Sequence, residues 1–286
     1  MKPAVEKVAI LGVGLVGASL GAAIRRSGFA VHVRGVGRSR SNLNVALERG
    51  CVDEIGHDAG KAVADADLVV LATPVDAFAS LLSVVAETAP REALVTDVGS
   101  VKRSVCAAAA AVGLGSRFLG GHPMAGGVTS GAEYANADLF EGRVVALTPT
   151  VDTCERARNV VTSMWRRVRA EVLELDAAEH DHVVAASSHL PQMIAVVLAA
   201  AAAKYDRPEL FARLAAAGFA SVTRTAASDP AMWKAIVAAN GDEIVGAMES
   251  FAGIWNQLRE AILHDDFDLV RSMMQEAADF KRDEKK

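Results

Sequence analysis

The first half of the chain alternates short runs of β-branched and aliphatic residues with segments whose apolar positions recur at helical spacing. Several of the runs are continuous and lack polar alternation, which is typical of strands buried on both faces of a sheet. The predicted strands are residues 7–11, 31–36, 68–72, 93–97, 118–120 and 144–148. The predicted helices between them are residues 16–27, 42–48, 78–87 and 101–112. This alternation predicts an α/β fold with a doubly wound parallel sheet.

The pattern changes near Asp176, beyond which the sequence contains no convincing strand. Apolar positions at helical spacing occupy residues 179–203, 208–214, 230–261 and 266–281. We therefore predict an α/β domain over residues 1–175 and an all-helical domain over residues 176–286. Alanine-rich apolar faces need another surface to bury against, so we expect a homodimer formed through helix–helix contacts. A self-contained helical bundle is the alternative.

Composition narrows the class of protein. Among the 286 residues, 51% are hydrophobic and 23% charged, which is typical of a soluble globular protein and excludes a largely disordered chain. The net charge of −5 argues against a nucleic-acid partner, since such binding relies on lysine and arginine at the phosphates. Three isolated cysteines and an N-terminus without signal-peptide features indicate a cytoplasmic protein. The longest uncharged apolar stretch, residues 190–203, is shorter than a membrane span, so we expect a buried helix there and no membrane contact.

A glycine motif directly follows the first predicted strand and opens a helix. In that context GVGLVG is the fingerprint of a dinucleotide site in a Rossmann-type domain. Its glycines permit a tight turn, a close approach to the pyrophosphate and packing of helix on strand, and the pyrophosphate then lies at the helix N-terminus. The candidate cofactor residues of this loop and of the loop after the strand at 68–72 are Gly12, Gly14, Leu15, Val16, Gly17, Thr73 and Pro74.

The end of the second predicted strand bears on the choice of cofactor. An NAD site would place an acid near Gly37 to accept the ribose 2′-hydroxyl, but Arg38, Ser39 and Arg40 follow instead. Guanidinium groups are suited to a bidentate grip on a 2′-phosphate, so these residues predict a preference for NADP over NAD. In the alternative interpretation Arg38 stacks on the adenine and discriminates little between the two.

Two further segments follow predicted strands, where doubly wound sheets place their ligands. Ser100 lies in DVGSVK, and His122 lies in GGHPMAG. A histidine between glycines and a proline is unsuited to a helix or a core, so His122 is a candidate functional residue. Ser100 also stands where it would cap the helix predicted from Val101, a role compatible with a functional one.

Taken together, these segments resemble the prephenate/arogenate dehydrogenase family, the oxidative decarboxylases of tyrosine biosynthesis. The resemblance rests on GVGLVG, DVGSVK, GGHPMAG, LFEG followed by VVALTP, SSHLPQ (187–192) and GFASVTRTAASDPAMW (218–233). The segments occur in the family's order over most of the chain. GGHPMAG combined with SSHLP and TRxAxSDPxMW is highly specific, whereas GxGxxG alone would not be.

The resemblance implies NAD(P)-dependent oxidative decarboxylation of prephenate or arogenate, with hydride passing from ring C4 to the nicotinamide. It implies that His122 accepts or polarises the proton of the 4-hydroxyl group, and that Ser100 hydrogen-bonds His122 and the substrate. His189 would help to hold the substrate, and Arg224 would pair with a substrate carboxylate. A salt bridge from Arg224 to Asp229 is the alternative role for that arginine.

Other functions and specificities stay open at this point. Some family members have a glutamate six residues after the catalytic histidine, where it joins an ionic network in the active site. Val128 stands at that position here and cannot do so, which leaves the preference for prephenate or arogenate undecided. A dehydrogenase of 4-amino-4-deoxyprephenate and a non-catalytic NADP(H)-sensing regulator are the alternatives. A reductase of the β-hydroxyacid type is disfavoured, because residues 179–203 contain no lysine. No metal site is expected, since His180 and His182 lie on different faces of a helix.

Overall fold

The computed structural model describes residues 3–127 and 129–283. Its N-terminal part is built on eight strands, which share one sheet. The strands are β1 (Val5–Leu11), β2 (Ala30–Val36), β3 (Glu54–Gly56), β4 (Leu68–Leu71), β5 (Leu94–Asp97), β6 (Phe118–Pro123), β7 (Val144–Thr148) and β8 (Glu171–Glu174). Their order across the sheet is β3-β2-β1-β4-β5-β6-β7-β8. This order, which turns back at β1, confirms the predicted doubly wound α/β fold.

One strand pair departs from the predicted parallel arrangement. β6 and β7 are antiparallel, while the other paired strands are parallel. To run parallel to its neighbour, a strand needs a connection that crosses back to the opposite ends of the strands. In the described part of the β6–β7 connection the only helical turn is Ala132–Tyr134, and the chain re-enters the sheet at the same ends of the strands at which it left.

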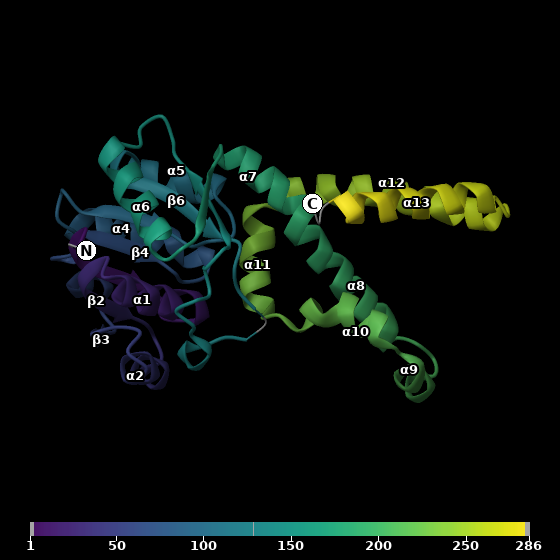
Figure 1. The fold of residues 1–286 in the computed structure, drawn as a ribbon, viewed down its shortest axis with the longest axis horizontal. Coiled ribbons are helices and arrows are strands. Elements are labelled where there is room, and N and C mark those ends of the chain that lie inside the picture. Colours follow the sequence, from purple (N-terminus) through teal and green to yellow (C-terminus); the bar gives the residue numbers. More distant parts are fainter. Residues whose placement is uncertain (1–2, 128, 284–286) are drawn as a thin grey trace.

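Six helices cover the two faces of the sheet (Figure 1). They are α1 (Leu15–Ser27), α2 (Arg40–Glu48), α3 (Ala59–Val63), α4 (Phe78–Thr88), α5 (Arg103–Ala111) and α6 (Glu155–Arg167). Along β1, Val8 and Ile10 join one apolar cluster, with α1 and α6, whereas Ala9 and Leu11 join another, with α4 and α5. Both faces are therefore buried, as the lack of polar alternation predicted.

Four elements of this sheet domain were not predicted. α3 has five residues, too few to show a helical period. β3 has three residues, too few for a recognisable run. β8 reads Glu-Val-Leu-Glu and is mostly exposed at the sheet edge. α6 is strongly polar overall but buries Val161, Met164 and Trp165 against the sheet. Each element is defined by its neighbours in space more than by its own sequence.

The remainder of the described chain is helical. Its helices are α7 (Ala177–Val184), α8 (Leu190–Ala203), α9 (Pro208–Leu214), α10 (Ala217–Thr223), α11 (Pro230–Ala239), α12 (Gly241–Leu263) and α13 (Phe267–Asp283). The single helix expected over residues 230–261 is in fact two, because the backbone leaves helical geometry at Asn240. Figure 1 shows α8 and the α12–α13 pair projecting away from the sheet.

A π-helical turn, Ala185–His189, joins α7 and α8 into one long helix, Ala177–Ala203. Pro191 lacks the N–H that would continue the α-helical ladder, and a wider turn accommodates that loss. By length and composition this helix could cross a membrane, but His180 and Asp181 within it are buried and hydrogen-bonded to the sheet domain. We therefore interpret it as a helix of the globular protein.

Contrary to expectation, α8 is not a buried helix in the single chain. Only Gln192 and Ala195 are buried, while Val197 is 63% exposed. Large apolar side chains are also exposed on α12 and α13, among them Ile254 and Phe280. The helical part thus presents apolar faces that no described residue of the same chain covers.

Candidate active site

The glycine loop between β1 and α1 has the geometry of a dinucleotide turn. Gly12 has φ +112°, and a Cβ there would lie 2.5 Å from the backbone of Ala72, so only glycine fits. A Cβ on Gly17 would lie 1.9 Å from the Gly12 carbonyl oxygen. Gly14 is the N-cap of α1, carries no capping side chain and has open space above it. The first amides of α1, beginning at Leu15 and Val16, are therefore free to bind an anion.

The turn after β2 holds the two arginines singled out from the sequence. Arg38 and Arg40 are exposed, and neither makes an ion pair within the described residues. The Ser39 hydroxyl accepts a hydrogen bond from the Asn42 amide at 3.3 Å and so caps α2. This turn lies beside the β1 loop, since β1 and β2 are paired along their length.

The carboxyl ends of β1, β4, β5 and β6 meet at one edge of the sheet, because these strands are adjacent and parallel. Thr73 and Pro74 follow β4, and the Gly12 loop packs on Thr73. Ser100 follows β5, and His122 lies near the end of β6. The predicted cofactor and catalytic residues of the sheet domain therefore share this edge.

Ser100 does not cap the next helix. Helix α5 begins at Arg103, two residues later than predicted. The N-terminal end of α5 is capped by a residue far away in the sequence. The Asp181 carboxylate accepts hydrogen bonds from the amides of Lys102 at 2.7 Å and Arg103 at 2.9 Å. The Ser100 side chain, half-buried at the shared edge, makes no hydrogen bond within the described residues.

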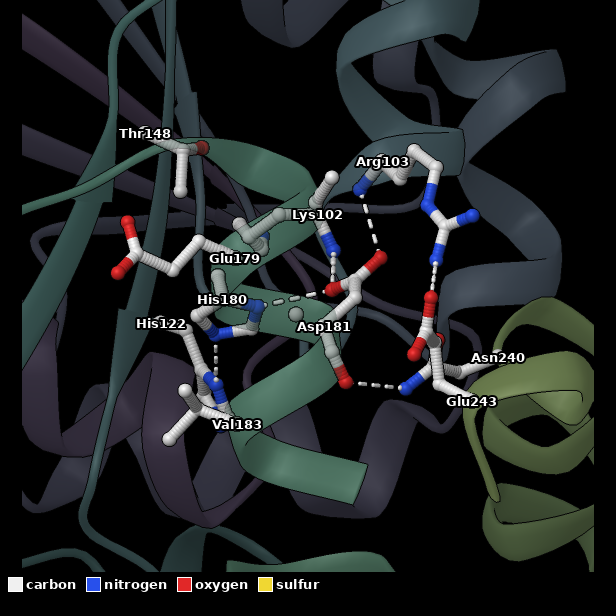
Figure 2. A network of polar contacts seen from close by, with 12 residues as sticks. Lys102, Arg103, His122, Thr148, Glu179, His180, Asp181, Val183, Asn240 and Glu243 are labelled. Carbon is white, nitrogen blue, oxygen red and sulfur yellow. Dashed lines mark hydrogen bonds and ion pairs between the residues drawn. The ribbon is translucent and has the colours of Figure 1, made fainter. Parts of the chain in front are cut away.

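His122 is bonded to the helical part of the chain (Figure 2). Its Nδ1 lies 2.8 Å from His180 Nε2, and His180 Nδ1 lies 2.8 Å from Asp181 Oδ1. Both His180 and Asp181 are at most 1% exposed. Burial lowers the pKa of His122 well below 6.5, and His180, Lys102 and His189 lower it further. His122 is therefore neutral and able to accept a proton at physiological pH.

Asp181 is held as a carboxylate. Burial opposes its ionisation, but hydrogen bonds from His180, Arg103 and Lys102 outweigh burial, so its pKa lies below the ordinary 3.8. The Asn240 side-chain amide also donates to the Asp181 carbonyl at 2.8 Å. One short segment of α7 thus ties together β6, α5 and the start of α12.

His189 lies in the π-helical turn, 1% exposed. Burial lowers the pKa of His189 to about 4. The Asp181 charge acts in the opposite direction, and the neighbouring His180 lowers the pKa further. His189 Nδ1 lies 3.3 Å from the Asn240 amide nitrogen, and the His189 ring meets Trp233 edge-on at 5.8 Å. His189 Nε2, Trp233 Nε1 and Asn240 Oδ1 are buried and have no hydrogen-bond partner among residues 3–127 and 129–283. Unpartnered polar atoms gathered in this way mark a place for a ligand.

A buried ion pair supports the floor of the site. Lys102 Nζ contacts Asp97, with both side chains 0% exposed, and also donates to the Gly121 carbonyl at 2.9 Å. Asp97 in turn accepts from the amides of Gly99 and Gly121. The pair therefore joins the end of β5, which precedes Ser100, to β6 at Gly121, the residue before His122.

Arg224 is not brought into this cluster within one chain. It begins a short 3-10 turn after α10, is exposed, and makes no ion pair within the described residues. Among the described residues Arg224 forms no salt bridge with Asp229, whose carboxylate instead caps α11 through the amide of Ala231. Val128, the position expected to affect substrate choice, lies outside the described residues.

Sequence reasoning missed several residues of this centre, namely Asp97, Lys102, His180, Asp181 and Asn240. Asp97 and Lys102 lie within DVGSVK, so the motif itself held that signal. His180 was considered only as a metal ligand. It is buried against His122, while His182 is exposed and bonded to Glu243.

Two models of known protein families match the chain. The model described as "Prephenate dehydrogenase, nucleotide-binding domain" matches residues 20–174. The model described as "Prephenate dehydrogenase, dimerization domain" matches residues 176–276. Together they cover nearly all of the described chain.

Individual proteins agree with the family models. Prephenate dehydrogenase of Bacillus subtilis is 31% identical over 96% of this chain and 75% of its own length. Cyclohexadienyl dehydrogenase of Zymomonas mobilis is 30% identical over 95% of this chain and 94% of its own length. The crystal structure of prephenate dehydrogenase from A. aeolicus, with hydroxyphenyl propionate and NAD+, superposes with a TM-score of 0.91 at 33% identity and covers 98% of both chains.

Proposed function

The chain belongs to the prephenate dehydrogenase family, and we propose that it oxidatively decarboxylates prephenate, arogenate or both with a nicotinamide cofactor. The observation that carries this proposal is the position of His122. A neutral histidine stands at the sheet edge where the glycine loop would present the cofactor. A base and a hydride acceptor on either side of one carbon are what this reaction requires.

The proposed reaction passes a proton and a hydride in opposite directions. A ring nitrogen of His122 takes the proton of the 4-hydroxyl while the hydride leaves C4 for the nicotinamide ring. The resulting dienone loses CO2, and the electron pair of the broken C–C bond restores aromaticity in the product ring. The protein mainly orients the reactants and places charge, because aromatisation supplies much of the driving force.

We assign the remaining site residues to substrate binding. His189 accepts from Asn240 at Nδ1 and is neutral, so its buried Nε2 bears a hydrogen that can be donated to substrate. Ser100 would hydrogen-bond the reacting hydroxyl. Arg224, a guanidinium without a partner in the described residues, would take a substrate carboxylate.

We propose further that the enzyme is a soluble, cytoplasmic homodimer. In each chain the boundary between the two domains lies between residues 175 and 176. The exposed apolar side chains of α8, α12 and α13 supply the interface, in the region that matches a dimerisation-domain model. Sedimentation equilibrium at micromolar concentration should then give about twice the chain mass of 29.9 kDa. A mass near that of one chain would contradict the dimer.

The proposed reaction is tested by reduced-cofactor formation in four assays, in which prephenate and arogenate are each supplied with NAD and with NADP. Turnover with either acid is the expected result. Folded protein that binds NADP but is silent in all four assays would contradict the proposal. Such a protein would then be assayed with 4-amino-4-deoxyprephenate, and silence there as well would favour a sensor.

We propose NADP as the preferred cofactor, because Arg38 and Arg40 are free beside the adenosine end of the site. Arg38→Asp should lower kcat/KM with NADP by about 10- to 100-fold, which corresponds to one lost charged hydrogen bond, and should change NAD kinetics little. Arg91→Asp is a matched control. It makes the same charge change on an exposed loop that precedes β5, at the amino ends of the parallel strands and away from the proposed cofactor site. An unchanged NADP/NAD ratio in Arg38→Asp would exclude phosphate recognition by this turn.

A further inference from the structure

The contacts of Asp181 determine where the hydrogens lie in the chain of bonds to His122 (Figure 2). An ionised carboxylate only accepts, and Asp181 is held ionised by three hydrogen bonds. The proton between Asp181 Oδ1 and His180 Nδ1, 2.8 Å apart, therefore belongs to His180.

The same reasoning applies at the next bond. A neutral imidazole that carries its hydrogen on Nδ1 has a lone pair on Nε2. His180 Nε2 must then accept, and its partner at 2.8 Å is His122 Nδ1. The opposite assignment would need a second proton on His180 and so a cation on a ring that is only 1% exposed.

We propose that Asp181 and His180 hold His122 in the tautomer with hydrogen on Nδ1, which leaves Nε2 bare to take the substrate proton. His180 is a positioning residue in this arrangement and does not touch the substrate. Its ring meets that of His122 at 67°, with centroids 5.0 Å apart, so it fixes the orientation of the base as well as its hydrogen. The catalytic part of this inference rests on the proposed function, whereas the tautomer does not.

The arrangement also links the base to the docking of the two domains. His122 belongs to β6 of the sheet domain, while His180 and Asp181 belong to α7 of the helical part. His122 contacts His180 across the boundary between the two parts, and the Asp181 carboxylate that accepts from His180 also caps α5. The correct tautomer of His122 is therefore a product of the packed interface.

The direct test is the protonation state of the His122 ring in the wild-type protein, measured by nitrogen-15 NMR of imidazole-labelled enzyme. His122→Asn identifies the resonances. Hydrogen on Nδ1 and a bare Nε2 are expected. A hydrogen on Nε2 would overturn the proposal, and this measurement requires neither turnover nor a variant at His180.

Variants at His180 test the consequence for catalysis. His180→Phe removes the acceptor, so we expect His122 to populate both tautomers and kcat to fall by about 10- to 100-fold with little change in KM. His180→Gln offers a carbonyl oxygen to His122 Nδ1 and should recover most of both the tautomer and kcat. His182→Phe is the matched control: it lies on the same helix but is exposed and bonded to Glu243, so kcat should not change.

The outcomes separate the two proposals. A wild type with the expected tautomer but no turnover in any assay would reject the proposed reaction and keep the proposal that His180 sets the tautomer of His122. A folded His180→Phe enzyme with unchanged kcat and an unchanged His122 tautomer would reject the role of His180 and keep the reaction. If His180→Phe lost kcat, His180→Gln failed to recover it, and the His122 tautomer were unaltered in both variants, the role of His180 would be rejected as well.

Discussion

The His122→Asn enzyme is expected to turn over its substrate about 10²- to 10⁴-fold more slowly than wild type, the usual contribution of a general base. Asparagine suits this test because its amide nitrogen can still donate to His180 Nε2, as His122 Nδ1 does at 2.8 Å. The lost group is then the second ring nitrogen alone. Cofactor affinity, measured by the quenching of tryptophan fluorescence, should be unchanged. Full turnover by a folded variant would remove His122 from the mechanism.

The pH dependence of the wild type gives an independent check of the same base. Burial, His180, Lys102 and His189 hold the pKa of His122 well below 6.5. A base with a lowered pKa stays unprotonated as the pH falls through 6.5, so kcat/KM should stay level there and decline only at lower pH. A decline centred at or above pH 6.5 would show that a different group, or an unshifted one, is titrating.

Lys102→Met is expected to lower the free energy of unfolding by about 3 to 5 kcal/mol. The substitution leaves the Asp97 carboxylate fully buried and without its cation, while methionine fills a similar volume. Two backbone amides still contact Asp97, but they do not neutralise its charge. Chemical denaturation followed by circular dichroism measures the change.

Two further variants show whether buried charge is the cause. Adding Asp97→Asn to Lys102→Met should recover most of the lost stability, because the paired charge is then absent altogether. Arg103→Met removes the neighbouring cation, whose ion pair with Glu243 is partly exposed, and should cost far less. If Lys102→Met were no less stable than Arg103→Met, the buried pair would not support this edge of the sheet.

The fold was predictable where the sequence pattern is local. β4 and the last four residues of β1 are continuous aliphatic runs, and their two-sided burial follows from that composition. β8 was missed because an edge strand with exposed glutamates has no apolar signature of its own. The break at Asn240 was missed although Asn240-Gly241 is a turn signal. The contact of the Asn240 side chain with the Asp181 carbonyl is tertiary and has no such signal.

The site divides in the same way. The glycine loop and His122 lie in short contiguous motifs, so their chemistry can be recognised along the chain. The partner of His122 is 58 residues away, and the carboxylate that caps α5 is 79 residues from Lys102. No spacing rule connects residues so far apart, and His180 can be assigned its role only once α7 is seen packed against β6.

The Asp181 carboxylate also has a consequence for how the chain is divided. A fragment cut between residues 175 and 176 would retain the whole sheet, yet α5 would lose its cap and His122 its partner. The isolated sheet domain would therefore carry a frayed helix and an unoriented base, although its motifs are complete. The junction at Asp176 separates two modules of the sequence, but we expect the folded molecule to unfold across it as one cooperative unit.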